Sequence, residues 1–249
     1  MERRWIIKNI FKIHPFYLIC LLICSFTGHL KDYIMISIII LFHEFGHILV
    51  SIIYKWKIDK VVILPFGAIT IFNEYINRPL KEEWFILIFG PIFQLVLSFF
   101  LNDKYAYYSN VILLFNLLPI YPLDGSKILN ILLNKFISFK KSHLLTIYIS
   151  FITVVFIIYK SSFNLILVLI LLFISKSILK EYKNHSLIFN RFLLERYNNN
   201  FKFKKYKYIN SLDLNKMKKD YRHFFKSKNG YITEKENLKK RFDFNSKKW

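Results

Sequence analysis

The stretch YIMISIIILFHEFGHILVSIIY, residues 33–54, decides the fold, because it places a metal-binding motif inside an apolar segment long enough to cross a bilayer. Its centre, residues 43–47, has the pattern H-E-x-x-H. Positions i and i+4 share one face of a helix, so His43 and His47 can bind one Zn²⁺. Glu44 is the only charged residue of the stretch and is placed to take a proton from a zinc-bound water. Ionisable side chains at membrane depth indicate a functional site.

The composition is that of a membrane protein. Of the 249 residues, 54% are hydrophobic and 19% aromatic, and the mean hydropathy is +0.31. The net charge of +21 would suggest nucleic acid binding in a soluble protein. Here the basic residues cluster between and after the apolar runs, so membrane topology and anionic lipid explain them better. We therefore expect contact with the lipid bilayer and no nucleic acid partner.

The apolar runs predict an α-helical, polytopic membrane protein with about six transmembrane helices. The predicted spans are residues 15–30, 33–54, 84–101, 106 to about 116, 143–159 and 162–179. Lysine and arginine are frequent in the N-terminal tail and in the second and fourth loops. The other three loops carry one lysine each, namely Lys31, Lys104 and Lys160. This alternation supports six spans and places both termini of an integral, multi-pass protein in the cytosol.

Residues 61–72 form an apolar, β-branched run that is too short to span the membrane as a helix. The run is centred on Pro65-Phe66-Gly67, a turn signal between two apolar halves. We predict a β-hairpin that dips into the membrane, with a membrane-surface loop as the alternative. Non-helical backbone at that depth must be buried in protein or line a cavity.

The last part of the chain is polar and strongly basic, which indicates a second domain. We expect a six-helix transmembrane domain with the metal-binding motif over residues 1–180 and a small cytosolic α/β module in the tail, 181–249. Such a small module needs a partner to be stable. Its predicted elements are a strand at 201–208, a helix from Asp213 to Phe225, a turn at Asn229-Gly230 and a final helix opened by the capping box Thr233-x-x-Glu236.

A catalytic zinc site needs a third protein ligand and leaves one position open. Asp124 is the only acid between Asp103 and Glu181, and it lies in a proline-rich break of an apolar segment. We predict that unwound backbone lets Asp124 reach the metal, with a helix cap or surface turn as the alternative. Asn116 is polar in an apolar run, and it could bind the substrate backbone or oxyanion, or equally bond a neighbouring helix.

The H-E-x-G-H motif and the later N-x-x-P-x-x-P-L-D-G motif together resemble the site-2 protease (M50) family of intramembrane zinc metalloproteases. The resemblance covers roughly residues 33–130 and implies one Zn²⁺ per chain. The residues that match the family's motifs are the zinc ligands His43, His47 and Asp124, the catalytic Glu44, the motif asparagine Asn116, and Pro65, Phe66 and Gly67 of a loop that approaches the substrate. The family also implies that the substrate is unwound to an extended strand.

Within the family, the layout most resembles the sporulation proteases that process a sigma-factor precursor. That resemblance implies a membrane-associated protein substrate cut near the cytosolic side, small membrane inhibitor and regulator proteins, and the mother-cell membrane surrounding the forespore. Two residues depart from the pattern of these relatives. Ser126 stands where relatives often have a second glycine, and Glu236 stands where relatives typically have an aspartate that contacts nucleotide ribose. The short tail therefore resembles a degenerate CBS-like module, for which homo-oligomer formation is expected ahead of ATP sensing.

Three other functions fit parts of the sequence. A site-2 protease of another pathway would cut an anti-sigma factor or signal-peptide remnants, but such relatives often carry a PDZ domain, and no segment here is large enough for one. A metal carrier or transporter needs ligands along a path and has no need for Glu44. A catalytically dead scaffold would not need Glu44 and a full ligand set. The compact cluster favours an intramembrane zinc metalloprotease.

Overall fold

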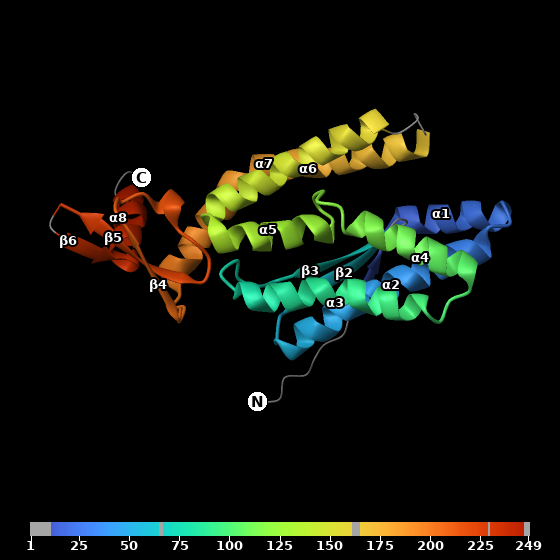
Figure 1. Cartoon of the computed structure of the whole chain (residues 1–249), viewed down its shortest axis with the longest axis horizontal. Coiled ribbons are helices and arrows are strands. Elements are labelled where there is room, and N and C mark those ends of the chain that lie inside the picture. Colours follow the sequence, from blue (N-terminus) through green and yellow to red (C-terminus); the bar gives the residue numbers. More distant parts are fainter. Residues whose placement is uncertain (1–10, 65–66, 161–164, 229, 247–249) are drawn as a thin grey trace. The chain divides into compact units, whose positions relative to one another are not determined.

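The computed structural model describes residues 11–64, 67–160, 165–228 and 230–246. Figure 1 shows its elements, which are β1 (Phe11–Ile13), α1 (Pro15–Phe26), α2 (Leu30–Ile53), β2 (Ile58–Leu64), β3 (Gly67–Phe72), α3 (Leu80–Ser98), α4 (Asp103–Asn116), α5 (Asp124–Phe136), α6 (Phe139–Lys160), α7 (Leu165–Asn198), β4 (Lys205–Ile209), the short 3₁₀ helix η1 (Leu214–Lys216), β5 (Tyr221–Ser227), β6 (Gly230–Thr233) and α8 (Glu234–Ser246). The chain divides into two compact units, one of Met1–Glu74 with Trp84–Asn116 and one of Tyr75–Glu83 with Leu117–Trp249.

Helix α2 carries the H-E-x-x-H motif as one uninterrupted helix, which agrees with the prediction for residues 33–54. Asp32 in its first turn favours the helix start through the helix dipole. His43, Glu44 and His47 all lie on the buried face. Within the described residues, α2 and α6 are long and apolar enough to cross a membrane, and α1 is a shorter apolar helix.

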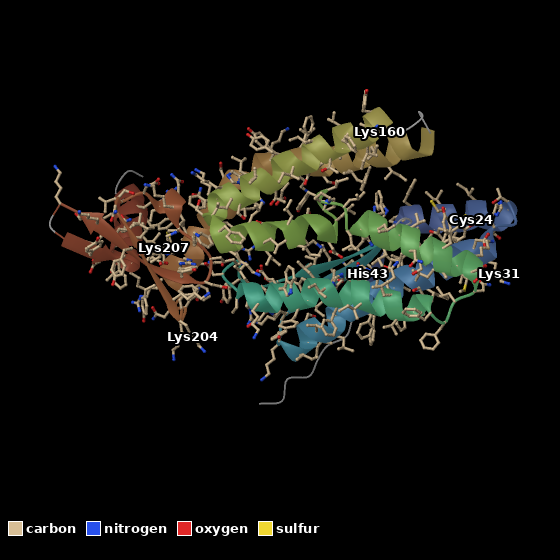
Figure 2. The ribbon with its side chains drawn as sticks, in the orientation of Figure 1. Cys24, Lys31, His43, Lys160, Lys204 and Lys207 are labelled. Atoms are coloured by element: carbon tan, nitrogen blue, oxygen red, sulfur yellow. The ribbon has the colours of Figure 1, made fainter. Side chains whose placement is uncertain are left out.

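Helix α1 has an apolar surface that no part of the described structure buries. Its exposed side chains include Leu22, Ile23 and Phe26. The free thiol of Cys24, labelled in Figure 2, belongs to the same helix. Continuous apolar surface of this kind fits contact with lipid rather than with water.

The strands of the first unit form one three-stranded sheet in the order β1-β2-β3. Strand β1 pairs with β2 in parallel, and β2 pairs with β3 antiparallel, with Val61 opposite Thr70 and Leu64 opposite Gly67. Pro65 and Phe66 lie outside the described residues, and the depth of the strand pair in a membrane stays a prediction. Strand β3 packs against α2, which brings this sheet to the metal-binding motif.

The proline-rich segment breaks the helical chain, although Asp124 does not lie within the break as predicted. Helix α4 ends at Asn116 and α5 begins at Asp124, after Leu123 in extended conformation (φ −65°, ψ 159°). A negative side chain in the first helical turn is favoured by the helix dipole. The irregular backbone is therefore confined to residues 117–123, and Asp124 is held by the start of a regular helix.

Helices α6 and α7 pack side by side as an antiparallel pair (Figure 1). The rings of Phe139 and Phe192 stack with their centroids 4.3 Å apart, and His143 bonds His185 through their Nδ1 atoms at 2.8 Å. Helix α7 continues to Asn198, well beyond the predicted end at residue 179. The continuation is polar but contains no glycine or proline, so nothing in it stops a helix.

The tail folds as an α/β module, but the predicted helix from Asp213 to Phe225 is wrong. Strand β5 occupies the last part of the segment that was predicted as a helix. It pairs with β4 in parallel and with β6 antiparallel. Lys207, labelled in Figure 2, belongs to β4. Asp220, at φ 60°, takes a conformation that no helix interior adopts. Burial then alternates through His223 and Phe225, which is the pattern of a strand.

The predicted capping box at the last helix is confirmed. The Thr233 amide donates to Glu236 Oε2 at 3.0 Å, and the Glu236 amide donates to Thr233 Oγ1 at 3.4 Å. These bonds satisfy two backbone donors that the helix start leaves without an intrahelical partner.

A buried ionic network joins the tail module to α7. The Arg196 guanidinium bonds the carboxylate of Glu234 at 3.1 and 3.2 Å, and His223 Nδ1 bonds Glu234 Oε2 at 3.0 Å. Arg196 also donates to Asn77 Oδ1 at 2.6 Å, which attaches the segment before α3 to the same network. His223 Nε2 accepts from the Lys218 amide, so the neutral ring donates through Nδ1.

Stability of the tail module should fall as the pH drops below the ordinary range of histidine. Burial, together with the Arg196 charge, lowers the pKa of His223, so the folded module keeps this ring neutral. Below about pH 6.5, His223 takes up a proton in the unfolded chain but not in the folded chain. The folding equilibrium constant therefore falls by up to about tenfold for each pH unit. The pKa of Glu234 is also lowered, since its bonds to His223 and Arg196 outweigh its burial, but this affects only more acidic conditions.

Hydrogen exchange of the β5 amides in the full chain, corrected for the intrinsic rate, measures this effect. Protection should decrease between about pH 7.5 and about pH 5.5 in the wild type. In His223→Gln it should be lower throughout and independent of pH in this range. Equal pH dependence in both proteins would contradict the assignment to His223.

Candidate metal centre

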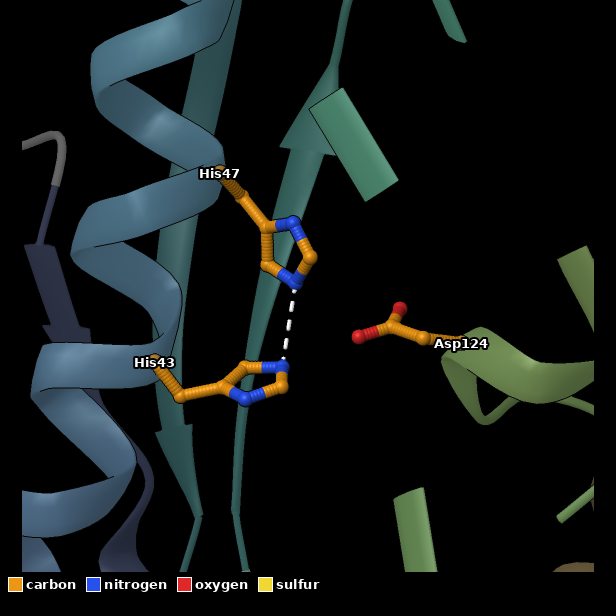
Figure 3. A group of neighbouring side chains, drawn as sticks. All are labelled: His43, His47 and Asp124. Carbon is orange, nitrogen blue, oxygen red and sulfur yellow. Dashed lines mark hydrogen bonds between the residues drawn. The ribbon is translucent and has the colours of Figure 1, made fainter. Parts of the chain in front are cut away.

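His43 and His47 point from one face of α2 toward a common position (Figure 3). Their Nε2 atoms are 3.1 Å apart, and both residues are at least 95% buried. Two nitrogens that each lie 2.0–2.1 Å from one tetrahedral zinc ion are separated by about 3.3 Å. The spacing of the two rings therefore fits a shared metal ion.

The second nitrogen of each ring fixes its orientation. His43 Nδ1 lies 2.7 Å from Gln94 Oε1, and His47 Nδ1 lies 2.7 Å from the carbonyl oxygen of Ile86. Both oxygens only accept hydrogen bonds, so each Nδ1 carries the proton. Each neutral ring then turns the lone pair of Nε2 toward the other ring. A cation between the two nitrogens resolves the repulsion of these lone pairs, as in metal sites whose histidines donate to an outer oxygen.

Gln94 is a site residue that the sequence reading missed. It is fully buried in α3, and its Nε2 donates to the Ser109 carbonyl at 2.8 Å, which points its oxygen at His43. The available signal was a lone amide in the apolar segment 84–101, because polar residues inside a span are seldom there by chance. Its partner lies too far along the sequence for any spacing rule to find.

Removing the Gln94 amide should weaken zinc binding about 10- to 100-fold, because His43 loses the bond that fixes its orientation. The variant is Gln94→Leu, and the measurement is zinc affinity by competition with a chromogenic chelator. Ser109→Ala is a matched control, since Gln94 bonds mainly to the backbone carbonyl of Ser109. Unchanged affinity in Gln94→Leu would contradict the role given to Gln94.

Glu44 follows His43 on the same helix and is 8% exposed. Its Oε2 accepts a hydrogen bond of 2.6 Å from the Thr70 hydroxyl of β3. This distance lies at the short end of the range for O–H···O hydrogen bonds. The carboxylate is thus held by β3 in a buried environment with little access to water.

Helix α3 has a glycine, Gly90, where it contacts the imidazole of His47. A Cβ atom at Gly90 would lie 2.3 Å from His47 Nε2 and 2.4 Å from its Cε1. Only a residue without a side chain fits at this point of contact between α2 and α3. Pro91, the next residue, lies inside α3.

Asp124 occupies the first turn of α5 and is 8% exposed; Figure 3 draws its carboxylate. Lys127, one turn further along, donates to its Oδ1 at 2.9 Å. A Cβ atom at Gly125 would lie 2.1 Å from the Leu117 carbonyl, so the irregular segment packs tightly against the helix start that carries Asp124. This explains the glycine in the Asp-Gly pair of the motif.

The structure gives less detail on two other predicted parts of the site, Asn116 and the substrate loop. Asn116 is the last residue of α4 and is half-buried. Of the predicted substrate loop Pro65-Phe66-Gly67, only the backbone of Gly67 is described, at the start of β3. Their contact with a substrate stays a prediction.

Comparison with known proteins shows the family of this chain. The Peptidase family M50 model matches residues 32–102, which include most of α2 and all of α3. Stage IV sporulation protein FB of Bacillus subtilis is 33% identical over 202 residues, covering 74% of this chain and 70% of that protein. The chain belongs to peptidase family M50. The M50 assignment makes it an intramembrane metalloprotease of the site-2 type, and its metal is zinc.

A further relative and a solved structure are also similar to this chain. Zinc metalloprotease MJ0392 of Methanocaldococcus jannaschii is 29% identical over 160 residues, covering 57% of this chain and 46% of that protein. A solved structure of the site-2 protease from the same organism matches with a TM-score of 0.53 at 24% identity. The match covers 69% of this chain and 89% of that structure, and it concerns the fold.

Proposed function

We propose that this M50 protease hydrolyses a peptide bond of a membrane-associated protein near the cytosolic side of the membrane. The observation that carries the proposal is the His43–His47 pair, whose outer nitrogens are both bonded to oxygen acceptors while the inner nitrogens face each other at 3.1 Å. Glu44, beside the pair, supplies the base that peptide hydrolysis needs and that metal storage or transport does not.

Asp124 is proposed as the third ligand of one zinc ion per chain. Histidine and aspartate are ordinary zinc ligands, and three protein ligands are typical of catalytic sites. Asp124 is buried, as are His43 and His47, and the side chains of all three are drawn in Figure 3. The Lys127 ammonium lies 2.9 Å from one carboxylate oxygen of Asp124, Oδ1.

In the proposed reaction, the bound metal, Glu44, Asn116 and the substrate loop have separate roles. Bound zinc supplies a Lewis acid that polarises the scissile carbonyl and lowers the pKa of a water molecule. Glu44 takes a proton from the attacking water and later gives it to the leaving amine nitrogen. Asn116 is proposed to hydrogen-bond the substrate backbone or the oxyanion. Pro65, Phe66 and Gly67 are proposed to contact the substrate as an extended strand beside β3, because such a strand can bond an exposed sheet edge.

We propose a six-span topology with both termini in the cytosol and the 61–72 hairpin dipping into the membrane. The exposed apolar surface of α1 and the apolar lengths of α2 and α6 support it. Lys31 lies in the first turn of α2 and Lys160 ends α6, where single lysines were expected in the sparsely charged loops (Figure 2). Reporter fusions that place residues 103–105 in the cytosol would exclude this topology.

The proposed substrate is a sigma-factor precursor of sporulation, and the proposed location is the mother-cell membrane around the forespore. The likeness to stage IV sporulation protein FB supports this setting. Small membrane inhibitor and regulator proteins are proposed as partners, and the tail, 181–249, as a degenerate CBS-like module that forms homo-oligomers. An anti-sigma factor or a signal-peptide remnant is the alternative substrate.

Co-expression with a sigma-factor precursor in a host that lacks sporulation genes tests the substrate. We expect an immunoblot to show the shortened product with the wild-type chain and not with Asp124→Ala. Asp103→Ala, at the start of α4, is a matched control and should cleave normally. Cleavage of an anti-sigma factor but not of the precursor would instead favour the alternative pathway.

A further inference from the structure

Strand β3 contributes one polar side chain to the catalytic carboxylate. Thr70 is the only hydroxyl-bearing residue of β2 and β3, whose sequences are IDKVVIL and GAITIF. Its Oγ1 donates to Glu44 Oε2 at 2.6 Å. Valine or isoleucine would be the ordinary choice at such a position, since β-branched apolar residues favour strands and would not compete for a hydrogen bond.

We propose that Thr70 is a positioning residue that holds Glu44 in the orientation needed for proton transfer. The inference rests on the proposed role of Glu44 as the base. One carboxylate oxygen accepts the Thr70 hydroxyl, which leaves Oε1 as the oxygen that receives the proton from water. Hydrogen bonding also restricts the three side-chain torsions of glutamate, which would otherwise let the carboxylate move away from the metal position.

The position of the Thr70 hydroxyl is itself fixed by the sheet. Thr70 pairs with Val61 in the antiparallel ladder of β2 and β3, and Val61 is fully buried and pairs with Phe11 of β1 on its other side. The β-branched side chain has few rotamers to choose from. A movement of β3 would therefore displace the hydroxyl, and with it the carboxylate of Glu44.

Thr70→Val tests the inference, because it keeps the shape of the side chain and removes only the hydroxyl. We expect kcat to fall about 10- to 100-fold with KM and zinc content unchanged, since displacement of a catalytic group by about 1 Å has effects of this order. Thr70→Ser keeps the hydroxyl, and its kcat should stay within about threefold of the wild-type value. Thr153→Val is the matched control, as the Thr153 hydroxyl donates to the Ile149 carbonyl of its own helix. Full kcat in Thr70→Val, or equal loss in Thr70→Ser, would overturn the proposal.

A second measurement needs neither substrate nor metal. Dicyclohexylcarbodiimide modifies carboxyl groups in apolar surroundings, and peptide mass spectrometry reports its rate at Glu44 in the zinc-free full chain. We expect modification several-fold faster in Thr70→Val and in Thr70→Ala than in the wild type and Thr70→Ser, with none in Glu44→Gln. Equal rates in all threonine variants would overturn the proposal. Because this readout is independent of cleavage, it still decides the role of Thr70 if the proposed proteolysis fails.

Discussion

Glu44→Gln should lose at least about 100-fold and up to about 10,000-fold in cleavage rate while it keeps one zinc ion per chain. Glutamine has nearly the same shape as glutamate and can accept the Thr70 hydrogen bond through its amide oxygen. It cannot take a proton from water at neutral pH. The imidazoles of His43 and His47 and their outer partners stay intact, so metal binding should not change.

Purified wild type and Glu44→Gln should be compared for substrate cleavage and for zinc by elemental analysis. Glu82→Gln is a matched control, because that side chain pairs with Arg78 at 3.6 Å and belongs to the other compact unit. It should cleave like the wild type. Cleavage by Glu44→Gln at the wild-type rate would exclude Glu44 as the base, and loss of zinc would mean that Glu44 also helps to hold the metal.

Gly90→Ala should lose both zinc and cleavage, although it adds a single methyl group to an apolar helix. The new Cβ would lie 2.3 Å from His47 Nε2, so the imidazole must leave the position in which its Nδ1 bonds Ile86. A zinc site that loses one of its proposed three ligands cannot keep its geometry. We expect zinc content below about a tenth of the wild-type value and no measurable cleavage, which follows from overpacking at a rigid point of the core.

Gly28→Ala provides a matched control for this prediction. Its Cβ would meet nothing within 4 Å, although its φ of +76° makes alanine unfavourable by about 1 kcal/mol. This variant should be slightly less stable but should retain zinc and activity. Normal zinc content in Gly90→Ala would show that the space beside His47 is not required.

The part of the site that is local in sequence could be predicted, and the part that depends on distant residues could not. His43, Glu44 and His47 follow from helical spacing alone, and Asp124 was singled out as the one acid in a long apolar region. Gln94 and the Ile86 carbonyl orient the imidazoles from another helix, and Thr70 reaches Glu44 from a strand. No periodicity or motif specifies such contacts, because they depend on how the elements pack.

The same distinction explains the outcome for the fold. The helix around the motif, the antiparallel strands near residues 61–72 and the capping box before α8 each have a strong local signal. The wrong helix between Asp213 and Phe225 shows where local signals mislead. There the left-handed Asp220 and the pairing of β5 with both β4 and β6 override the helical pattern.

The most direct measurement is cleavage of a membrane-associated substrate by the purified full chain before and after removal of its metal. We predict that a strong chelator abolishes cleavage, that about one equivalent of zinc per chain restores it, and that the same treatment restores nothing in Glu44→Gln. Cleavage by the zinc-free chain would contradict the proposed mechanism at its centre.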